Sequence, residues 1–301
     1  MSGSTLAFGM VLPVQAQSVL MAEPWESSGT VDDLLAVALA CEQHGFDNVS
    51  VCDHVAIPRE FAPTMSTTWY DPVATLGYLA GRTRRVKLLS QVYVVPYRHP
   101  LQTAKAFATL DALSGGRAVL GVGVGHVKAE FEVLGVPFAE RGRITSEAIT
   151  EIRAAFADEY GSGDFGQAPR PVQSGGPPIW VGGSTVAARR RASELGDGWL
   201  PQGPPEGGMT AAIAEINGWR AEAGRADRPF AMGAMTALYV GEPDWEVGRC
   251  LAGEPAKLAE HLEHLRSIGA THVQVRFRSR SATELIDQIA AFGTDVVPLL
   301  G

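Results

Sequence analysis

Four apolar, strand-like segments of this chain each end in residues that can carry chemistry, and this layout constrains the fold more than any other feature. The segments are NVSVCDH ending at Asp53 and His54, KLLSQVYVV around Gln91, AVLGVGVGH ending at His126, and PIWVGGS ending at Ser184. In a closed parallel α/β barrel the carboxyl ends of all strands open on one face, where the site forms. The layout therefore predicts that residues far apart in sequence meet on one ligand, as in an enzyme.

Strand-like and helix-like patterns alternate along the chain. Strands are expected at 5–12, 47–51, 86–95, 117–120, 178–181, 198–200, 230–240 and 271–277. Helices are expected at 31–44, from 72, at 100–114, 127–134, 139–158, from 184, at 205–223, at 254–267 and at 281–292. Such alternation indicates a parallel sheet, and eight units favour closure into a barrel. We expect one domain over 1–301, with an inserted Gly-, Pro- and Ser-rich excursion at 159–177.

The composition narrows the possible partners and the compartment. A formal charge of -8 lacks the basic footprint that nucleic-acid binding needs. No apolar run approaches about 18 residues and no signal peptide is evident, so neither a membrane span nor export is expected. Three sparsely placed cysteines indicate a reducing cytoplasm. His261 and His264 lack an HExxH motif or nearby acidic ligands, so we expect no metal site.

Two glycine-rich turns follow predicted strands. In GVGVGH, ending at His126, glycines let backbone amides approach an anion or a flat ring, although a tight packing turn explains the pattern equally well. In VGGS, Ser184 is expected to cap the next helix, whose first amides would face a phosphate. A plain capped turn is the alternative. The basic run Arg189–Arg191 just beyond is interpreted as a solvated helix face.

The pair Asp53-His54 stands just past the second expected strand. A histidine titrates near neutral pH and can exchange a proton while an oxygen-bearing substrate gains or loses hydride. Asp53 would orient that imidazole or contact a cofactor. His99 is interpreted as a helix cap before Pro100, and the Arg143 region as a surface or subunit-contact salt bridge.

Together these segments resemble the bacterial luciferase-like family of flavin-utilising oxidoreductases. The matching stretches are GFDNVSVCDH, DPVATLGYLAGRTRRVKLLSQVYVVPYRHP, FATLDALSGGRAVLGVGVGH, EFEVLGVPFAERGRITSE and PPIWVGGSTVAARRRASELGDGWLP. The resemblance covers about residues 5–275 and is dense between 45 and 200. The subgroup it most resembles is the actinobacterial one that uses the deazaflavin coenzyme F420 in place of FMN.

This resemblance implies a (β/α)8 TIM barrel with insertions and a cofactor ring over the strand ends. Related deazaflavin enzymes carry a non-prolyl cis peptide bulge in the third strand behind the ring. It maps to Gln91–Val92, with Ser90–Gln91 as the next choice. The cofactor contacts that the resemblance implies are Asp53, Gln91, Val92, Gly123, Gly125 and His126 near the ring, and Gly182, Gly183, Ser184 and Thr185 at the phosphate of the tail.

The resemblance also assigns roles. His54 matches the acid/base of deazaflavin dehydrogenases, with Asp53 or His126 assisting. Sugar-phosphate dehydrogenases of the family place Glu near the His126 position, so the histidine argues against that substrate class. Trp69, Tyr70 and Tyr97 indicate a more apolar pocket.

The expected function is hydride transfer between reduced F420 and a small organic substrate, either a carbonyl/alcohol pair or an activated C=C bond. The alternatives are a monooxygenase that uses reduced FMN and O2, and a non-catalytic flavin-binding barrel. The resemblance further suggests a homodimer.

Overall fold

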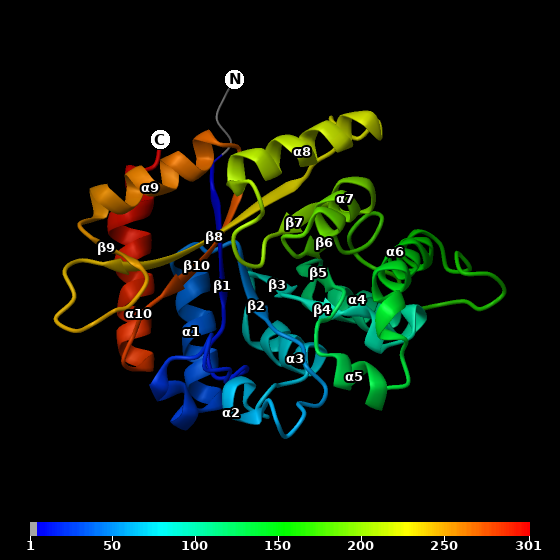
Figure 1. Cartoon of the computed structure of the whole chain (residues 1–301), viewed down its shortest axis with the longest axis horizontal. Helices are drawn as coiled ribbons and strands as arrows, with labels where there is room; N and C mark the ends of the chain where they lie inside the picture. Colours follow the sequence, from blue (N-terminus) through cyan, green and yellow to red (C-terminus); the bar gives the residue numbers. More distant parts are fainter. Residues whose placement is uncertain (1–4) are drawn as a thin grey trace.

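Eight parallel strands close into a barrel in the computed structural model, which describes residues 5–301 (Figure 1). The order runs around the ring as in the sequence, and β10 closes it by pairing with both β8 and β1. The barrel strands are β1 (Ala7–Val11), β2 (Asn48–Val51), β3 (Lys87–Ser90), β5 (Ala118–Gly123), β6 (Ile179–Gly182), β7 (Gly198–Leu200), β8 (Ala231–Val240) and β10 (His272–Phe277). The predicted TIM barrel is confirmed.

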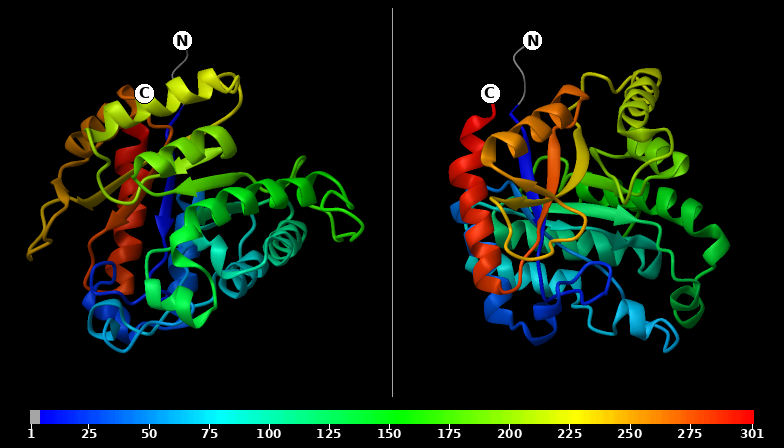
Figure 2. Two further views of the ribbon diagram at one scale, coloured as in Figure 1. Left: turned by 45° about the vertical axis from the view of Figure 1, so that its right-hand side comes forward. Right: turned by 60° about the vertical axis from the view of Figure 1, so that its left-hand side comes forward.

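Helices cover the outside of the barrel, as the turned views show (Figure 2). The long ones are α1 (Val31–Gln43), α3 (Pro72–Arg82), α4 (Pro100–Ser114), α6 (Arg141–Ala157), α7 (Val186–Leu195), α8 (Gly208–Glu222), α9 (Pro255–Ser267) and α10 (Ala282–Ala291). Short helices α2 (Ala62–Met65) and α5 (Lys128–Val133) lie in the connections after β2 and β5. Within residues 5–301, no helix combines the length and apolarity that crossing a membrane requires.

Local sequence signals explain where the helices begin and end. Thr30 caps α1 by accepting from the amide of Asp33, whose carboxylate in turn accepts from the amide of Thr30 at 2.8 Å. His99 caps α4 as predicted, accepting from the amide of Leu101. Gly115 ends α4 with φ +70°, a conformation that glycine adopts without steric cost.

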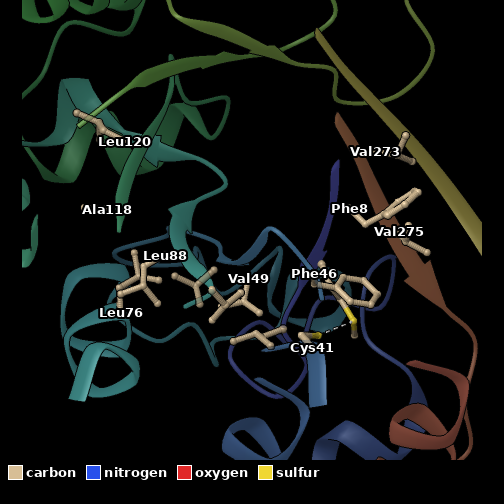
Figure 3. Packing of buried hydrophobic residues seen from close by; sticks show 14 of the residues in the cluster. Phe8, Cys41, Phe46, Val49, Leu76, Leu88, Ala118, Leu120, Val273 and Val275 are labelled. Atoms are coloured by element: carbon tan, nitrogen blue, oxygen red, sulfur yellow. Dashed lines mark hydrogen bonds between the residues drawn. The ribbon is translucent and has the colours of Figure 1, made fainter. Parts of the chain in front are cut away.

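The core between the strands and the helices is the largest apolar cluster of the molecule (Figure 3). Phe8 on β1 meets Phe292 after α10 edge-to-face at 5.0 Å, and Phe292 also contacts Phe277 at 5.4 Å. Both faces of β5, β6 and β7 are buried, which is why these segments read as continuous apolar runs. β2 is buried as well, although it carries Asn48 and Ser50. Complete burial of a large apolar side chain such as that of Phe292 stabilises the fold by about 1.5–3 kcal/mol.

The expected third strand, 86–95, is interrupted in the structure. β3 ends at Ser90, the Gln91–Val92 peptide bond is cis as the resemblance implied, and β4 (Tyr93–Val94) resumes pairing with β5. At the interruption Ser90 Oγ donates to the Gly121 carbonyl and accepts from the Gly121 amide, both at 3.0 Å. The side chain thus replaces the backbone ladder between the two strands.

Several other expectations need correction. The short helix α2, between the strand expected at 47–51 and the helix expected from 72, was not predicted, and neither was β9 (Leu251–Gly253). The fourth strand extends to Gly123 instead of ending at Leu120. Residues 158–178, which include the excursion expected at 159–177, contain neither helix nor strand. They connect α6 to the start of β6, at the end of the barrel away from the strand carboxyl ends.

Candidate active site

Val92 of the bulge lies between the two glycine turns. A β-carbon added to Gly123 would stand 2.3 Å from one Val92 methyl, and one added to Gly182 would stand 2.5 Å from the other. Glycine at both positions therefore makes room for Val92. The structure brings together three patches that the sequence placed at separate strand ends. The backbone at Gly123 and Gly182 thus encloses the Val92 side chain, and this arrangement of three residues is called the Val92 cradle.

His54 is held by a buried carboxylate that the sequence analysis missed. Its Nδ1 lies 2.6 Å from Oε2 of Glu130, a fully buried side chain on α5. The other oxygen of Glu130 accepts from the amides of Val55 and Ala56, at 2.8 and 3.1 Å. Glu130 therefore fixes both the imidazole and the backbone that follows it.

The surroundings of Glu130 determine which nitrogen of His54 carries a proton. Burial opposes ionisation of Glu130, but the hydrogen bonds from His54 and from two backbone amides hold the pKa of this carboxyl below its ordinary value. An ionised carboxylate can only accept, so His54 Nδ1 donates and Nε2 is left for a substrate. The Tyr97 hydroxyl also donates to Glu130 Oε2 at 3.1 Å, and burial beside that carboxylate raises the pKa of Tyr97.

Two aromatic side chains flank the imidazole. The Trp69 indole packs edge-on against His54 with 4.3 Å between ring centroids, and the His126 ring lies 5.5 Å away. Burial, together with the nearby His54, lowers the pKa of His126. A depression of about 540 Å3 opens beside His126 between α2 and α5, and Phe61 and Met65 form part of its wall. This depression gives a substrate an approach to His126.

Asp53 does not take the first of its two expected roles, orienting the imidazole, while the second, contact with a cofactor, stays a prediction. Its carboxylate accepts from the Val94 amide at 2.8 Å and from Arg98 Nη2 at 2.9 Å, and neither oxygen contacts His54. Arg98 also lies over the Tyr93 ring, 4.2 Å from its centroid. The orienting role that the sequence suggested for Asp53 thus belongs to Glu130. Asp53 instead ties the end of β2 to β4, just beyond the bulge.

The VGGS turn differs in detail from its prediction. Thr185, not Ser184, caps α7, which begins at Val186. The Ser184 hydroxyl is engaged by the 202–203 backbone, donating to the Gly203 carbonyl at 2.7 Å and accepting from the Gln202 amide at 3.0 Å. Gly183 has φ +113°, which lets the chain turn into the helix. The first-turn amides of α7 have no partner inside the helix and start from exposed residues.

The Arg189–Arg191 run is only partly a solvated face. Arg189 is 1% exposed, pairs with Glu215 at 2.6 Å and donates to the Ser184 carbonyl at 2.7 Å. It thereby supports the VGGS turn from behind. Arg190 behaves as predicted and makes an exposed pair with Glu194. Arg191 reaches the Gly142 carbonyl on α6.

Arg143 and His261, both considered in the sequence analysis, each have a side-chain partner in the structure. Arg143 pairs with Glu147 on the exposed face of α6, in line with a surface salt bridge. His261 contacts the Thr236 hydroxyl at 3.0 Å. Among residues 5–301 no group of three or more His, Cys, Asp or Glu side chains is arranged to hold a metal ion.

Comparison with known proteins places this geometry in a family. A family model described as luciferase-like monooxygenase matches residues 6–249. The chain belongs to the luciferase-like monooxygenase family. It is thus an enzyme of the oxidoreductase class, in a family of flavin and deazaflavin oxidoreductases.

Named relatives give the resemblance more detail. The chain is 37% identical to an F420-dependent glucose-6-phosphate dehydrogenase of Beutenbergia cavernae over 182 residues, which are 56% of this chain and 52% of that protein. It is 31% identical to a 5,10-methylenetetrahydromethanopterin reductase of Methanolobus tindarius over 208 residues, 67% of this chain and 60% of the relative.

A solved structure shares the fold at lower identity. A riboflavin lyase, crystallised with modified FMN and riboflavin, superposes with a TM-score of 0.83 at 14% identity. The match covers 98% of this chain and 91% of the lyase. At this identity the likeness shows the fold alone.

Proposed function

We propose that this protein is an F420-dependent oxidoreductase that moves a hydride between the reduced deazaflavin and a small organic substrate. The observation that carries the proposal is the His54–Glu130 pair, 2.6 Å apart at the strand ends beside the Val92 cradle. The likeness to the F420-dependent dehydrogenase of Beutenbergia cavernae supports the choice of cofactor.

The residues present fit a flat ring with a phosphate-bearing tail. A β-carbon at Gly123 or Gly182 would clash with Val92, so the position of Val92, which would lie behind a bound ring, depends on glycine at both places. Gly125, with φ +76°, and His126 continue this edge. Gly183, Thr185 and the first amides of α7 form the place where a phosphate would bind. When bound, F420 supplies a carbon that donates or accepts hydride.

The protein's own part in the reaction is proton transfer and orientation. Because Glu130 accepts the Nδ1 proton, His54 Nε2 is the atom that exchanges a proton with the substrate oxygen. A negative Glu130 also stabilises the positive imidazolium that forms when Nε2 is protonated. His126, whose pKa is lowered, stays neutral near pH 7 and can donate a hydrogen bond to the same oxygen. Trp69 restricts rotation of the His54 ring and keeps water from one face of it.

The test begins with cofactor binding. The purified protein is titrated with F420 and, separately, with FMN, while quenching of cofactor fluorescence is followed. The proposal expects saturable quenching of F420, and the reduced form should then be oxidised by at least one member of a ketone, aldehyde and enone panel. Binding of FMN alone, with O2 consumption once the bound FMN is supplied in its reduced form, would replace the proposal by the monooxygenase alternative. Binding without any turnover would favour a non-catalytic flavin-binding barrel.

A variant then tests the assigned proton carrier. His54→Ala should lower turnover by roughly 10²-fold or more while the affinity for F420 is retained, because only the acid/base is lost. His264→Ala, at an exposed position on α9, is the matched control and should leave turnover unchanged. Equal turnover in His54→Ala and in the unchanged protein would remove His54 from the mechanism.

A further inference from the structure

A cavity of about 370 Å3 opens at the carboxyl ends of β1 and β10 and beside the middle of β8, on the opposite side of the barrel mouth from the Val92 bulge. Most of its wall is apolar and includes Val11, Leu20, Met21, Met235 and Leu285. Its volume lies in the range of sites that enclose small organic molecules. Nothing in the proton-transfer chemistry above uses this cavity.

Apolar side chains at the mouth of the cavity are unusually exposed. Leu20 is 83% exposed, Met235 is 49% exposed and Met21 is 38% exposed. Single exposed apolar residues are common, but a group of them around one cavity is typical of a binding site. Two of the three are methionines, whose flexible thioether chains adapt to ligands of different shape. The mouth is therefore suited to an apolar ligand body.

The charged groups in the cavity wall already have partners. Arg276 pairs with Glu23 at 3.0 Å, and Glu23 Oε2 also accepts from Arg278 Nη2 at 3.1 Å. Glu26 accepts from the amides of Val14 and Glu23, at 2.8 and 2.7 Å. A phosphate or carboxylate ligand would have to break one of these pairs. The cavity consequently favours a neutral ligand.

One polar atom in the wall lacks a partner. Gln274 is 97% buried, since its exposed fraction is 3%, and its Oε1 makes no hydrogen bond among the described residues. Its Nε2 donates to Asn48 Oδ1 at 3.0 Å, while Asn48 Nδ2 faces Asp47 Oδ2 at 3.4 Å. These contacts fix the orientation of both amides, so the unused atom is an acceptor. A buried acceptor without a donor costs free energy that a ligand O–H or N–H would recover.

The cavity adjoins the His54 site through two contacts. Ala16, in the wall, forms an antiparallel bridge with Trp69, the residue that packs on His54. Gln15, also in the wall, accepts from the Cys52 amide at 3.0 Å, two residues before His54. A molecule that reaches from the cavity towards Trp69 therefore approaches the imidazole.

We propose that this cavity is the subsite for the body of the substrate, a neutral, largely apolar molecule with one hydrogen-bond donor that Gln274 Oε1 accepts. The inference rests on the proposed function, because it assigns the cavity to that function's substrate. The protein would recognise this molecule by apolar contact with Leu20, Met21 and Met235. The buried Gln274 Oε1 would accept its one hydrogen bond.

The chain carries its own probes for a test that needs no turnover. The protein is labelled with methyl-¹³C methionine, and Met10, Met21 and Met235 report on the cavity, whereas Met209 on α8 lies outside it. Met65 reports on the depression beside His126. The ligand probe is 4-tert-butylcyclohexanol, compared with its methyl ether, which has the same body but no donor. Both are titrated with and without saturating F420.

The expected result is that the alcohol shifts the Met21 and Met235 methyl resonances and leaves Met209 in place. The ether should bind about fivefold more weakly than the alcohol, a factor that corresponds to the loss of one neutral hydrogen bond. In Gln274→Leu the alcohol should lose this advantage over the ether. Met235→Trp should abolish binding of both, and Leu113→Trp, at a 72% exposed position on α4, is the matched control. Thermal melting checks that each variant is folded.

Other results would overturn the inference. Shifts confined to Met65, or none at solubility-limited probe concentration, would show that the cavity does not take such a body. Equal affinities for alcohol and ether in the unchanged protein would exclude Gln274 as the acceptor, and this contrast decides even if Gln274→Leu fails to fold. Competition between the probe and F420 would assign the cavity to the cofactor. A protein that binds the probe but quenches neither cofactor would refute the proposed function alone.

Discussion

Replacing Glu130 by Gln separates the charge of this side chain from its shape. The amide oxygen of Gln can still accept from the amides of Val55 and Ala56, which Glu130 holds at 2.8 and 3.1 Å. The loop after β2 should therefore keep its place. What disappears is the charge-assisted hydrogen bond to His54 Nδ1 at 2.6 Å, and with it the stabilisation of a protonated imidazole.

The size of the effect follows from that one contact. A hydrogen bond to a charged group contributes about 1.5–3 kcal/mol, and Glu130 is fully buried, so solvent screens little of it. Taking about 2 kcal/mol as the loss in the transition state, at 1.36 kcal/mol for each factor of ten, turnover should fall about 30-fold. The KM for the substrate should change little, because Glu130 lies behind His54 rather than against the substrate.

The assay is the oxidation of reduced F420, followed by absorbance, with an acceptor found in the panel described above. Glu147→Gln is the matched control, since it removes the same charge at an exposed position on α6, where Glu147 pairs with Arg143. It should retain full turnover. If Glu130→Gln melts like the unchanged protein and turns over within twofold of it, then Glu130 does not support His54 in catalysis.

Two more predictions concern the cradle and the response to pH. Gly123→Ala should lower the free energy of unfolding by about 1–3 kcal/mol and weaken cofactor binding, because its β-carbon would stand 2.3 Å from a Val92 methyl. Gly81→Ala in α3, with open space around the new carbon, should be neutral or stabilising by up to about 1 kcal/mol, and equal melting of the two variants would contradict the packing argument. Burial lowers the pKa of His272, with Lys87 adding to the effect and Asp47 opposing it. The folded state therefore binds a proton at His272 more weakly than the unfolded chain does. The free energy of unfolding should consequently fall as the pH drops through about 6.5. His272→Gln should flatten that slope between about pH 7 and pH 5 in urea unfolding curves, and an unchanged slope would count against the assignment.

The barrel was predictable because its signals are local. The runs at β5 and β6 are continuous in apolar residues because both faces of these strands are covered. Thr30, His99 and Gly115 mark helix ends where they were expected. The interruption at Gln91–Val92 was reached through the family resemblance, not through periodicity. It depends on Ser90 meeting Gly121 across two strands, and no pattern within either strand reveals that contact.

The site was less predictable because its contacts cross between elements. Asp53 stands next to His54 in the sequence, yet Arg98 and the Val94 amide occupy its carboxylate. Glu130 reaches the imidazole across 76 residues from a six-residue helix that shows no motif. Only the three-dimensional path of α5 identifies it.

The bridge between Ala16 and Trp69 joins the segment after β1 to the segment after β2, and the Gln17 and Val19 amides extend the join to the carbonyls of Thr68 and Thr64. These two stretches of chain therefore form one structural unit. An engineer who grafts either stretch from a relative without the other would break their shared backbone bonds and displace the indole from the imidazole. Exchange of both together is the route by which this scaffold could acquire a new preference while its proton-handling centre stays assembled.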